Sequence, residues 1–398
     1  MLAFVIAPFV IALLILVFIR TIKHIHQYNF KNIKLIEMVF GLFLFGGFIF
    51  CALSFLIKGN YELKRFFTRL AYNYIAIWMY IGIGLLIALI IRWLIWMFIH
   101  KNRNYNKSLY RNITIIFVTL FTSIMMIYGT INAHKLYITN YEIQATKKSQ
   151  FENLNIVLIA DLHIGYNVNL KHMQDMVEKI NSQNPDIVIL AGDIFDSDYE
   201  AIENPEEMIK VLSSINSKYG KYAVYGNHDI QEKVVMGFTF NNSGEDKKNS
   251  SADERMVKFI EDIGFTALYD SYVSLGDIYI YGRPDSHKIN FGNMTRIPAN
   301  EITKGLNLDS YIICVDHEPK DLEELSKAGV DLDLSGHTHN GQFWPGTISI
   351  DWIWDNAYGL KQIGDKMISI VTSGVGLFGF DIRTGCFAEI CAIDINFN

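Results

Sequence analysis

Histidine, aspartate and asparagine residues recur in short motifs along the second half of the chain. The motifs are "DLH" (161–163), "GDIFD" (192–196), "GNHD" (226–229), the single residue His317 and "GHTH" (336–339). Imidazole and carboxylate groups are the usual protein ligands of divalent transition metals such as Mn, Fe and Zn. These motifs contain no cysteine, which argues against a structural zinc site. The residue types therefore indicate a metal centre that carries out a reaction.

The candidate ligands are too many for one ion and about the right number for two. They are two aspartates, one asparagine and four histidines: Asp161, His163, Asp193, Asn227, His317, His337 and His339. Two ions about 3.5–4 Å apart can hold a hydroxide between them and clamp a phosphate group during its displacement. Such a pair needs one carboxylate that contacts both ions, and Asp193, in the middle of the series, is the candidate.

Each motif follows a short run of apolar, often β-branched residues, which is the pattern of a strand buried on both faces. These runs lie at 155–160, 187–191, 221–225, 311–315 and 330–335. Helical spacing of apolar residues occurs between runs, as in "NLKHMQDMVEKINSQ" and "KDLEELSKAG". Strands that alternate with helices indicate an α/β layered fold. Since sites in open α/β sheets lie beyond the carboxyl ends of the strands, we expect the motifs to meet there.

The order and approximate spacing of these motifs resemble those of the calcineurin-like metallophosphoesterases, over residues 152–396. The bacterial membrane-associated branch is most similar, because it shares "NGQ" (340–342) and "SGVGLFGFDIR" (373–383). Asn340 departs from that branch, in which glycine is more usual. The resemblance implies a two-sheet α/β sandwich with helices outside. It also implies two divalent metal ions (Mn, Fe or Zn) and hydrolysis of phosphodiesters or pyrophosphates by a metal-bridging hydroxide.

The resemblance also gives each site residue a role. Three residues would bind the first ion: Asp161, His163 and His339. Three others would bind the second: Asn227, His317 and His337. Asp193 would bridge the two ions, and His228 would protonate the leaving oxygen or steady the phosphoryl group, as suits an imidazole that titrates near neutral pH. Asp196 and Asp229 match catalytic-site positions that orient the metal ligands.

The first third of the chain has a different character. Apolar stretches lie at about 2–19, 35–57, 73–98 and 112–132, and each approaches or exceeds the ~20 residues that a membrane-spanning helix needs. The first lacks the basic start and the cleavage site of a secretion signal, so we interpret it as a retained helix. We therefore expect a four-helix transmembrane region over 1–133, a linker over 134–151 and the phosphoesterase domain over 152–398.

Charge divides the chain at the same place. Residues 1–133 contain 13 Lys and Arg but only two acidic residues, a net charge of +11, which leaves −17 for the remainder because the whole chain carries −6. An acidic domain argues against a nucleic-acid partner, which would need surface Lys and Arg to bind phosphates. It suits a domain that binds cations.

Four spans would place the N-terminus and the phosphoesterase domain on the same side of the membrane. The loops expected on the opposite side carry eight basic residues, and the segments expected on the same side as the phosphoesterase domain carry seven. Under the positive-inside rule this count favours an extracytoplasmic domain, in an integral protein of the bacterial cell membrane. Arg92 lies near the end of the third apolar stretch beside Trp93 and Trp96, so we expect its side chain to snorkel to the interface.

Three functions remain open at this point. The chain could be a hydrolase of a lipid-linked phosphoester, a hydrolase of soluble phosphoesters that its helices anchor, or a membrane sensor with a catalytically silent domain. The complete ligand set favours hydrolysis. Arg283 and His287 could approach the site, and the polar stretch 241–255 is expected to be a loop or lid. Cys386 and Cys391 could pair if the fold brings them together.

Overall fold

The computed structural model describes residues 31–99, 107–232, 253–286 and 296–397, with residues 19, 22–23, 26, 234–235 and 238–239 in addition. The chain divides into two compact units, Met1–Ile75 and Ala76–Asn398. The boundary falls inside a long helix, α3 (Tyr61–Ile99), and not at the end of the apolar region.

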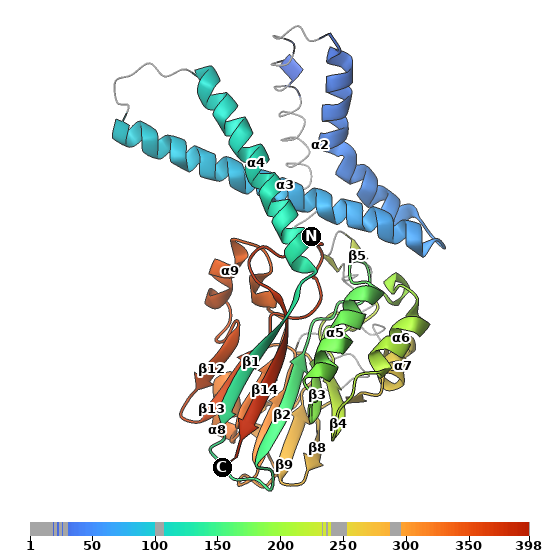
Figure 1. The fold of residues 1–398 in the computed structure, drawn as a ribbon, viewed down its shortest axis with the longest axis vertical. Coiled ribbons are helices and arrows are strands. Elements are labelled where there is room, and N and C mark those ends of the chain that lie inside the picture. Colours follow the sequence, from blue (N-terminus) through green and yellow to red (C-terminus); the bar gives the residue numbers. More distant parts are fainter. Residues whose placement is uncertain are drawn as a thin grey trace. The chain divides into compact units, whose positions relative to one another are not determined.

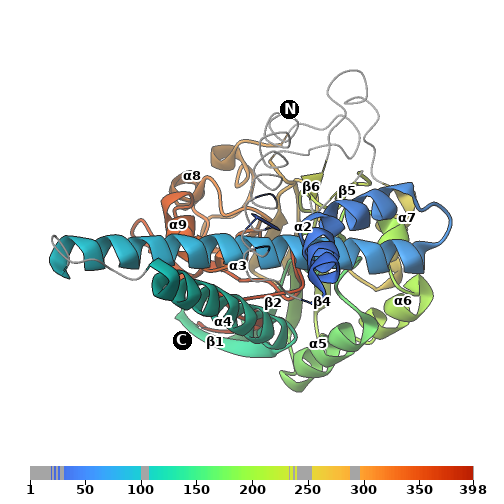
Figure 2. The same ribbon diagram turned by 90° about the horizontal axis from the view of Figure 1, so that it is seen from above.

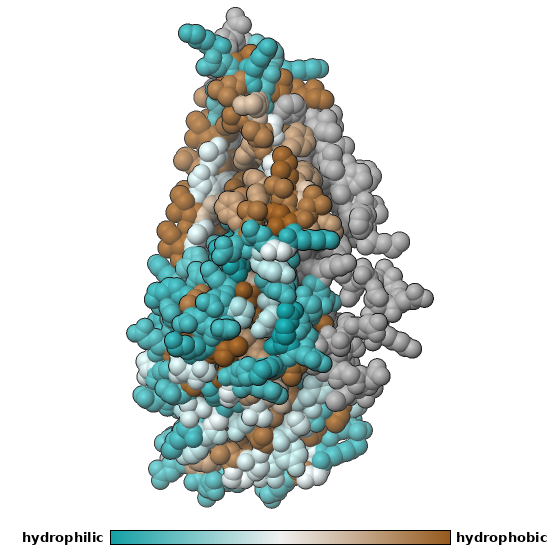
Figure 3. Space-filling model, turned by 90° about the vertical axis from the view of Figure 1, so that its right-hand side faces the viewer, coloured by the Kyte–Doolittle hydropathy of each residue, from teal (hydrophilic) through white to brown (hydrophobic). Residues whose placement is uncertain are grey.

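Within the described residues, three helices are long and apolar enough to cross a membrane, where four were expected. They are α2 (Ile33–Leu56), α3 and α4 (Lys107–Ala133). Apart from residue 19, the stretch expected over 2–19 lies outside the described residues, so the charge count that favours an extracytoplasmic domain stays a prediction. Exposed apolar side chains gather over the helices, whereas the visible face of the two-sheet domain is largely hydrophilic (Figure 3).

Helix α3 begins at Tyr61, a dozen residues before the apolar stretch that predicted it. Its first turns carry Lys64, Arg65 and Arg69, and these charges lower the local hydropathy, so an apolar stretch does not mark the start of the helix. With 39 residues, it is ~58 Å long, well beyond the hydrocarbon core of about 30 Å. In the first unit its Tyr74 hydroxyl donates to the Leu44 carbonyl, and a Cβ on Gly47 would lie 2.0 Å from the Tyr74 ring, so this contact requires glycine.

Two six-stranded sheets form the body of the second unit (Figure 1). In spatial order the first sheet consists of β1 (Leu136–Gln144), β14 (Ala388–Asn396), β2 (Asn153–Ile159), β3 (Ile187–Ala191), β4 (Gly220–Val224) and β7 (Thr266–Ala267). The second consists of β12 (Gly359–Ile363), β13 (Met367–Val371), β11 (Leu332–Ser335), β10 (Tyr311–Val315), β9 (Ile278–Gly282) and β8 (Ser271–Leu275). A short separate pair is formed by β5 (Val234–Val235) and β6 (Phe238–Thr239).

Helices cover the outer face of each sheet (Figure 2). Those of the first sheet are α5 (Leu170–Ser182), α6 (Pro205–Ser213) and α7 (Glu254–Asp262), and the second has α8 (Leu322–Ala328). A short helix, α9 (Gly346–Ser349), follows the "GHTH" motif. Polar and apolar residues do not alternate in strand β2, because both of its faces are buried. Ile156 and Leu158 face the core between the sheets, while Val157 and Ile159 face the helices. The two-sheet α/β architecture is therefore confirmed.

Residues 134–151, which were expected to be a linker, contain strand β1. This strand pairs in parallel with β14 over nine residues, from Leu136 with Ala388 to Gln144 with Asn396. Only two residues, His134 and Lys135, separate α4 from β1. The helix therefore continues directly into the sheet, and no flexible spacer connects them.

The C-terminal end of α4 also packs against the segment 382–386. The Asn132 side chain donates to the carbonyls of Arg383 and Cys386 at 3.1 and 2.8 Å, and the backbone N–H of Arg383 donates to the Gly129 carbonyl at 3.0 Å. From α3, the Tyr80 hydroxyl forms a hydrogen bond with that of Thr384. These contacts join the membrane helices of the second unit to a segment that leads into the candidate site.

Candidate metal centre

The predicted ligands stand just beyond the carboxyl ends of β2, β3, β4, β10 and β11. Five of them adopt left-handed backbone conformations, with φ between 43° and 70°: Asp161, His163, Asp193, His337 and His339. Such a conformation costs about 1–3 kcal/mol for a residue with a Cβ and persists only where its surroundings enforce it. Strain in so many residues at one edge of the sheets is typical of a functional site.

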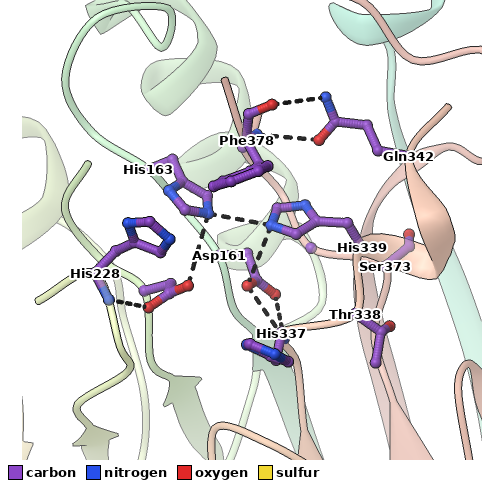
Figure 4. A network of polar contacts seen from close by, with 12 residues as sticks. Asp161, His163, His228, His337, Thr338, His339, Gln342, Ser373 and Phe378 are labelled. Atoms are coloured by element: carbon purple, nitrogen blue, oxygen red, sulfur yellow. Dashed lines mark hydrogen bonds and ion pairs between the residues drawn. The ribbon is translucent and has the colours of Figure 1, made fainter. Parts of the chain in front are cut away.

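Asp161, His163 and His339 form the first of two buried clusters. The Nε2 atoms of the two histidines face each other at 3.1 Å, and Asp161 Oδ1 lies 3.4 Å from His339 Nε2 (Figure 4). Ligand atoms about 2.0–2.2 Å from a common ion are roughly 3.0–3.5 Å apart, so this spacing suits a bound cation. Close packing holds Asp161 in place, because a Cβ on Gly336 would lie 2.5 Å from its Oδ2.

Asp193, His317 and His337 form the second cluster. His317 Nε2 lies 3.1 Å from Asp193 Oδ2 and 3.1 Å from His337 Nδ1. The other ring nitrogen of His317, Nδ1, is 2.9 Å from the Ala191 carbonyl and must donate to it, which leaves Nε2 directed at the carboxylate. A lone pair and a carboxylate oxygen at this distance require a cation or a proton between them.

Asn227 completes the surroundings of the second cluster. It lines the same pocket as Asp193 and His337. Its Oδ1 is buried and, within the part of the chain that the structure describes, has no hydrogen-bond partner. An unsatisfied buried acceptor carries a penalty of about 1–3 kcal/mol, which a metal ion would remove. The chemistry of the donor set and this orphan oxygen both fit a divalent metal.

The Asp193 carboxylate lies between the two clusters. Its Oδ2 is 3.1 Å from His317 Nε2 and 3.8 Å from His163 Nε2, and its Oδ1 accepts the backbone N–H of His228 at 2.8 Å. One oxygen thus faces ligands of both clusters while the other is held by the backbone. This is the geometry that a bridging carboxylate needs.

The two histidines of the "GHTH" motif belong to different clusters. Burial and the neighbouring charge of His317 lower the pKa of His337 to about 4. Burial, with His163 and Arg383 nearby, lowers the pKa of His339 well below its usual range. Both rings are therefore neutral at neutral pH and keep a lone pair for a metal ion.

The three predicted catalytic residues lie around the clusters. His228 lines the pocket, its Nδ1 is 2.9 Å from Ser197 Oγ, and its ring packs against those of His163 and Phe378 (Figure 4). Asp196 places Oδ1 3.7 Å from His163 Nδ1, where it can orient that ring. Asp229 accepts three backbone N–H groups, those of Ile194, Phe195 and Gly226, at 2.7–3.0 Å. Asp229 therefore holds the turn that contains Asp193 against the turn that contains Asn227.

A pocket of about 420 Å³ opens over the clusters. Its lining consists of Asp193, Asn227, His228, His337, Thr338, His339, Gly341, Gln342, Phe343 and Phe378. Phe343 packs against Phe380, and both lie in an apolar cluster with Tyr80 of α3 and Phe121 of α4. The pocket therefore has a polar floor that carries the ligands and an apolar wall that continues into the helices.

Two residues that support the site were not identified from the sequence. The Gln342 amide donates to the carbonyls of Phe378 and Ile382 at 3.1 Å each and accepts the Phe378 N–H at 3.0 Å (Figure 4). The fully buried Arg383 donates to the carbonyls of Ser373, Gly374, Gly376 and Phe387. Their motifs, "NGQ" and "SGVGLFGFDIR", served only to show the resemblance. A glutamine and an arginine would have been expected on the surface by residue type.

Further expectations from the sequence concern residues around the site, namely two possible pocket residues, a loop and a cysteine pair. Arg283 is buried and pairs with Asp316 and Asp321 at 3.1 and 3.0 Å, and it is not part of the pocket lining. His287 and residues 241–252 lie outside the described residues. Cys386 and Cys391 are both free thiols, so the pair that the sequence left open does not form.

Residues 154–341 match the model of the calcineurin-like phosphoesterase family. An uncharacterized metallophosphoesterase of Campylobacter jejuni is 27% identical over 281 residues, which are 69% of this chain and 67% of that protein. A transmembrane protein with metallophosphoesterase domain from Danio rerio is 27% identical over 290 residues, 69% of this chain and 61% of that protein. The chain thus spans about two thirds or less of these relatives. An uncharacterized metallophosphoesterase of Aquifex aeolicus is 28% identical over 259 residues, 64% of this chain and 90% of that protein. The chain therefore contains a calcineurin-like metallophosphoesterase domain, and this family of domains implies metal-dependent hydrolysis of phosphoesters.

Proposed function

We propose that this protein is a membrane-anchored hydrolase that cleaves phosphodiester or pyrophosphate bonds with two divalent metal ions. The observation that supports this most directly is the Asp193 carboxylate between two ligand clusters. One ion would be held by Asp161, His163 and His339, and the other by Asn227, His317 and His337. When bound, the ion pair would activate a water molecule and offset the negative charge of the phosphate group.

The residues of the chain would orient the substrate and move a proton. His228 lines the pocket and belongs to neither cluster, so its ring borders the space that a substrate would occupy. Ser197 fixes the direction of that ring through Nδ1. We assign His228 as the group that protonates the leaving oxygen, and Asp196 and Asp229 as residues that hold the ligands in position.

Metal removal tests this proposal. The full-length protein, purified in detergent and loaded with Mn²⁺, is expected to contain two ions per chain and to hydrolyse bis-p-nitrophenyl phosphate. Chelation is expected to remove both ions and the activity together, because the proposed hydrolysis depends on the ion pair. Mn, Fe and Zn are then added back one at a time, and elemental analysis and turnover are measured after each addition.

The outcomes of this experiment separate the alternatives. A protein that binds two ions but cleaves neither phosphodiesters nor pyrophosphates would be the silent membrane sensor. Activity that survives complete removal of the metal would overturn the proposed mechanism.

We further propose that the substrate is lipid-linked. The apolar pocket wall at Phe343 continues through Phe380 to the residues of α3 and α4, so an acyl or prenyl chain could leave the site along it. Replacing Phe343 with serine is expected to raise KM for a detergent-solubilised long-chain alkyl pyrophosphate about tenfold, the effect of losing one apolar contact. KM for ADP should stay unchanged.

The half-exposed Phe387 provides the matched control, since it lies outside the pocket. Its replacement by serine should leave both substrates unaffected. An equal rise of KM for ADP and for the alkyl pyrophosphate in the Phe343→Ser protein would instead favour a hydrolase of soluble phosphoesters.

A further inference from the structure

A second cavity, remote from the metal ligands, lies between α3 and α4. It measures about 680 Å³ and is lined by Leu85, Ala88, Leu89, Arg92, Tyr110, Arg111, Thr114 and Ile115. The first four residues come from α3 and the others from α4. Two arginines, one from each helix, therefore border a groove whose other walls are mostly apolar.

The electrostatics of these helices favour an anion in the groove. From residue 63 to residue 141 the chain contains no aspartate or glutamate. Each arginine contributes a positive charge to the groove. Two guanidinium groups from different helices give this groove a positive potential, which attracts an anion whatever other hydrogen bonds they make. A group with negative oxygens would fit, since guanidinium binds phosphate through two parallel hydrogen bonds.

The positions of the arginines along their helices indicate the depth of the groove. Arg92 lies seven residues before Ile99, the end of α3, and Arg111 lies four residues after Lys107, the start of α4. At 1.5 Å per residue, they are ~10 Å and ~6 Å from neighbouring helix ends. Trp93 and Trp96, both more than half exposed, stand beside Arg92 and are typical of the membrane–water interface.

The apolar part of the groove faces away from those helix ends. Leu89 and Leu85 lie one and two turns before Arg92 on α3, and Ile115 lies one turn after Arg111 on α4. All three side chains are between 44% and 60% exposed. The groove thus offers two cations at one end and apolar surface at the other, which matches the headgroup and the chains of a lipid.

We propose that this groove binds an anionic phospholipid, with its phosphate on Arg92 and Arg111 and its acyl chains along Leu85, Leu89 and Ile115. A free phosphate ion would match the arginines but not the apolar walls. The site is separate from the metal clusters, and its existence does not depend on the proposed hydrolytic function.

Native mass spectrometry of the full-length protein in detergent tests the proposal. The probes are phosphatidylglycerol and phosphatidylcholine with identical acyl chains. The wild type is expected to prefer phosphatidylglycerol about 30-fold, which corresponds to about 1 kcal/mol for each arginine. In the double variant R92Q/R111Q the preference should fall to near unity, and in R92K/R111K it should be partly retained.

Lys135→Gln is the matched control, because it removes an exposed cation just beyond the opposite end of α4. It should retain the full preference. Circular dichroism, expected to be unchanged in the variants, shows that each protein is folded. Equal binding of the two lipids by the wild type, retained preference in R92Q/R111Q, or displacement of the lipid by excess inorganic phosphate would each overturn the proposal.

Discussion

Replacing Asp193 with asparagine is expected to lower kcat for bis-p-nitrophenyl phosphate by a factor on the order of 10³ or more. Asp193 presents one oxygen to both clusters, so its charge would contribute to the binding of both ions. Asparagine preserves the oxygen that accepts the His228 N–H, and with it the turn. The substitution therefore removes the charge while the backbone contact remains, and elemental analysis should find fewer than two ions per chain.

Asp175→Asn is the control for this variant, since Asp175 lies on the outer helix α5 and is paired with Lys171 at the surface. It should retain both ions and full turnover. Circular dichroism should show that both variants are folded. An Asp193→Asn protein that holds two ions and retains more than about a tenth of the wild-type kcat would contradict the bridging role.

The strand ends of the site could be predicted from the sequence because the information is local. Each motif follows a run of buried residues, and the carboxyl ends of parallel strands meet at one edge whatever the rest of the chain does. The division of "GHTH" between two clusters was expected from the resemblance. The structure places His339 with Asp161 and His337 with His317, and the assignment of each group to a metal ion stays a prediction.

The features that the sequence did not reveal depend on contacts between distant residues. Strand β1 pairs with β14, some 250 positions away along the chain, and nothing in "LYITNYEIQ" identifies its partner. The start of α3 was missed because charged residues interrupt its hydropathy. Arg383 is fully buried because several backbone carbonyls accept its N–H groups, and composition cannot predict such an arrangement.

This dependence on distant contacts also explains how the membrane helices could influence the site. Asn132 of α4 donates to the Arg383 carbonyl, and the Arg383 guanidinium holds the loop at 373–376. In that loop, Gly374 lies against Asp161, where a Cβ would be 2.7 Å from the aspartate Cβ. A ligand of the first cluster is thus connected to the end of α4 through one buried side chain.

Replacing His228 with alanine is expected to lower kcat by a factor of about 10²–10⁴ for substrates with a poor leaving group, such as a phenyl or alkyl phosphodiester. An unactivated alkoxide or phenoxide needs a proton as it leaves, and His228 is the pocket histidine outside both clusters. p-Nitrophenolate is stable without a proton, so bis-p-nitrophenyl phosphate should lose much less. Steady-state kinetics on the two substrates give the ratio that reports proton donation.

Metal content and a control variant determine how the His228→Ala result is interpreted. The variant should retain two ions per chain, because His228 is not a proposed ligand. His134→Ala, which removes an exposed histidine outside the pocket, should leave both substrates unaffected. Equal losses for both leaving groups, with the ions retained, would assign His228 to holding the phosphoryl group. Unchanged kinetics on both substrates would remove it from the mechanism, because a proton donor cannot be deleted without slowing the departure of a basic leaving group.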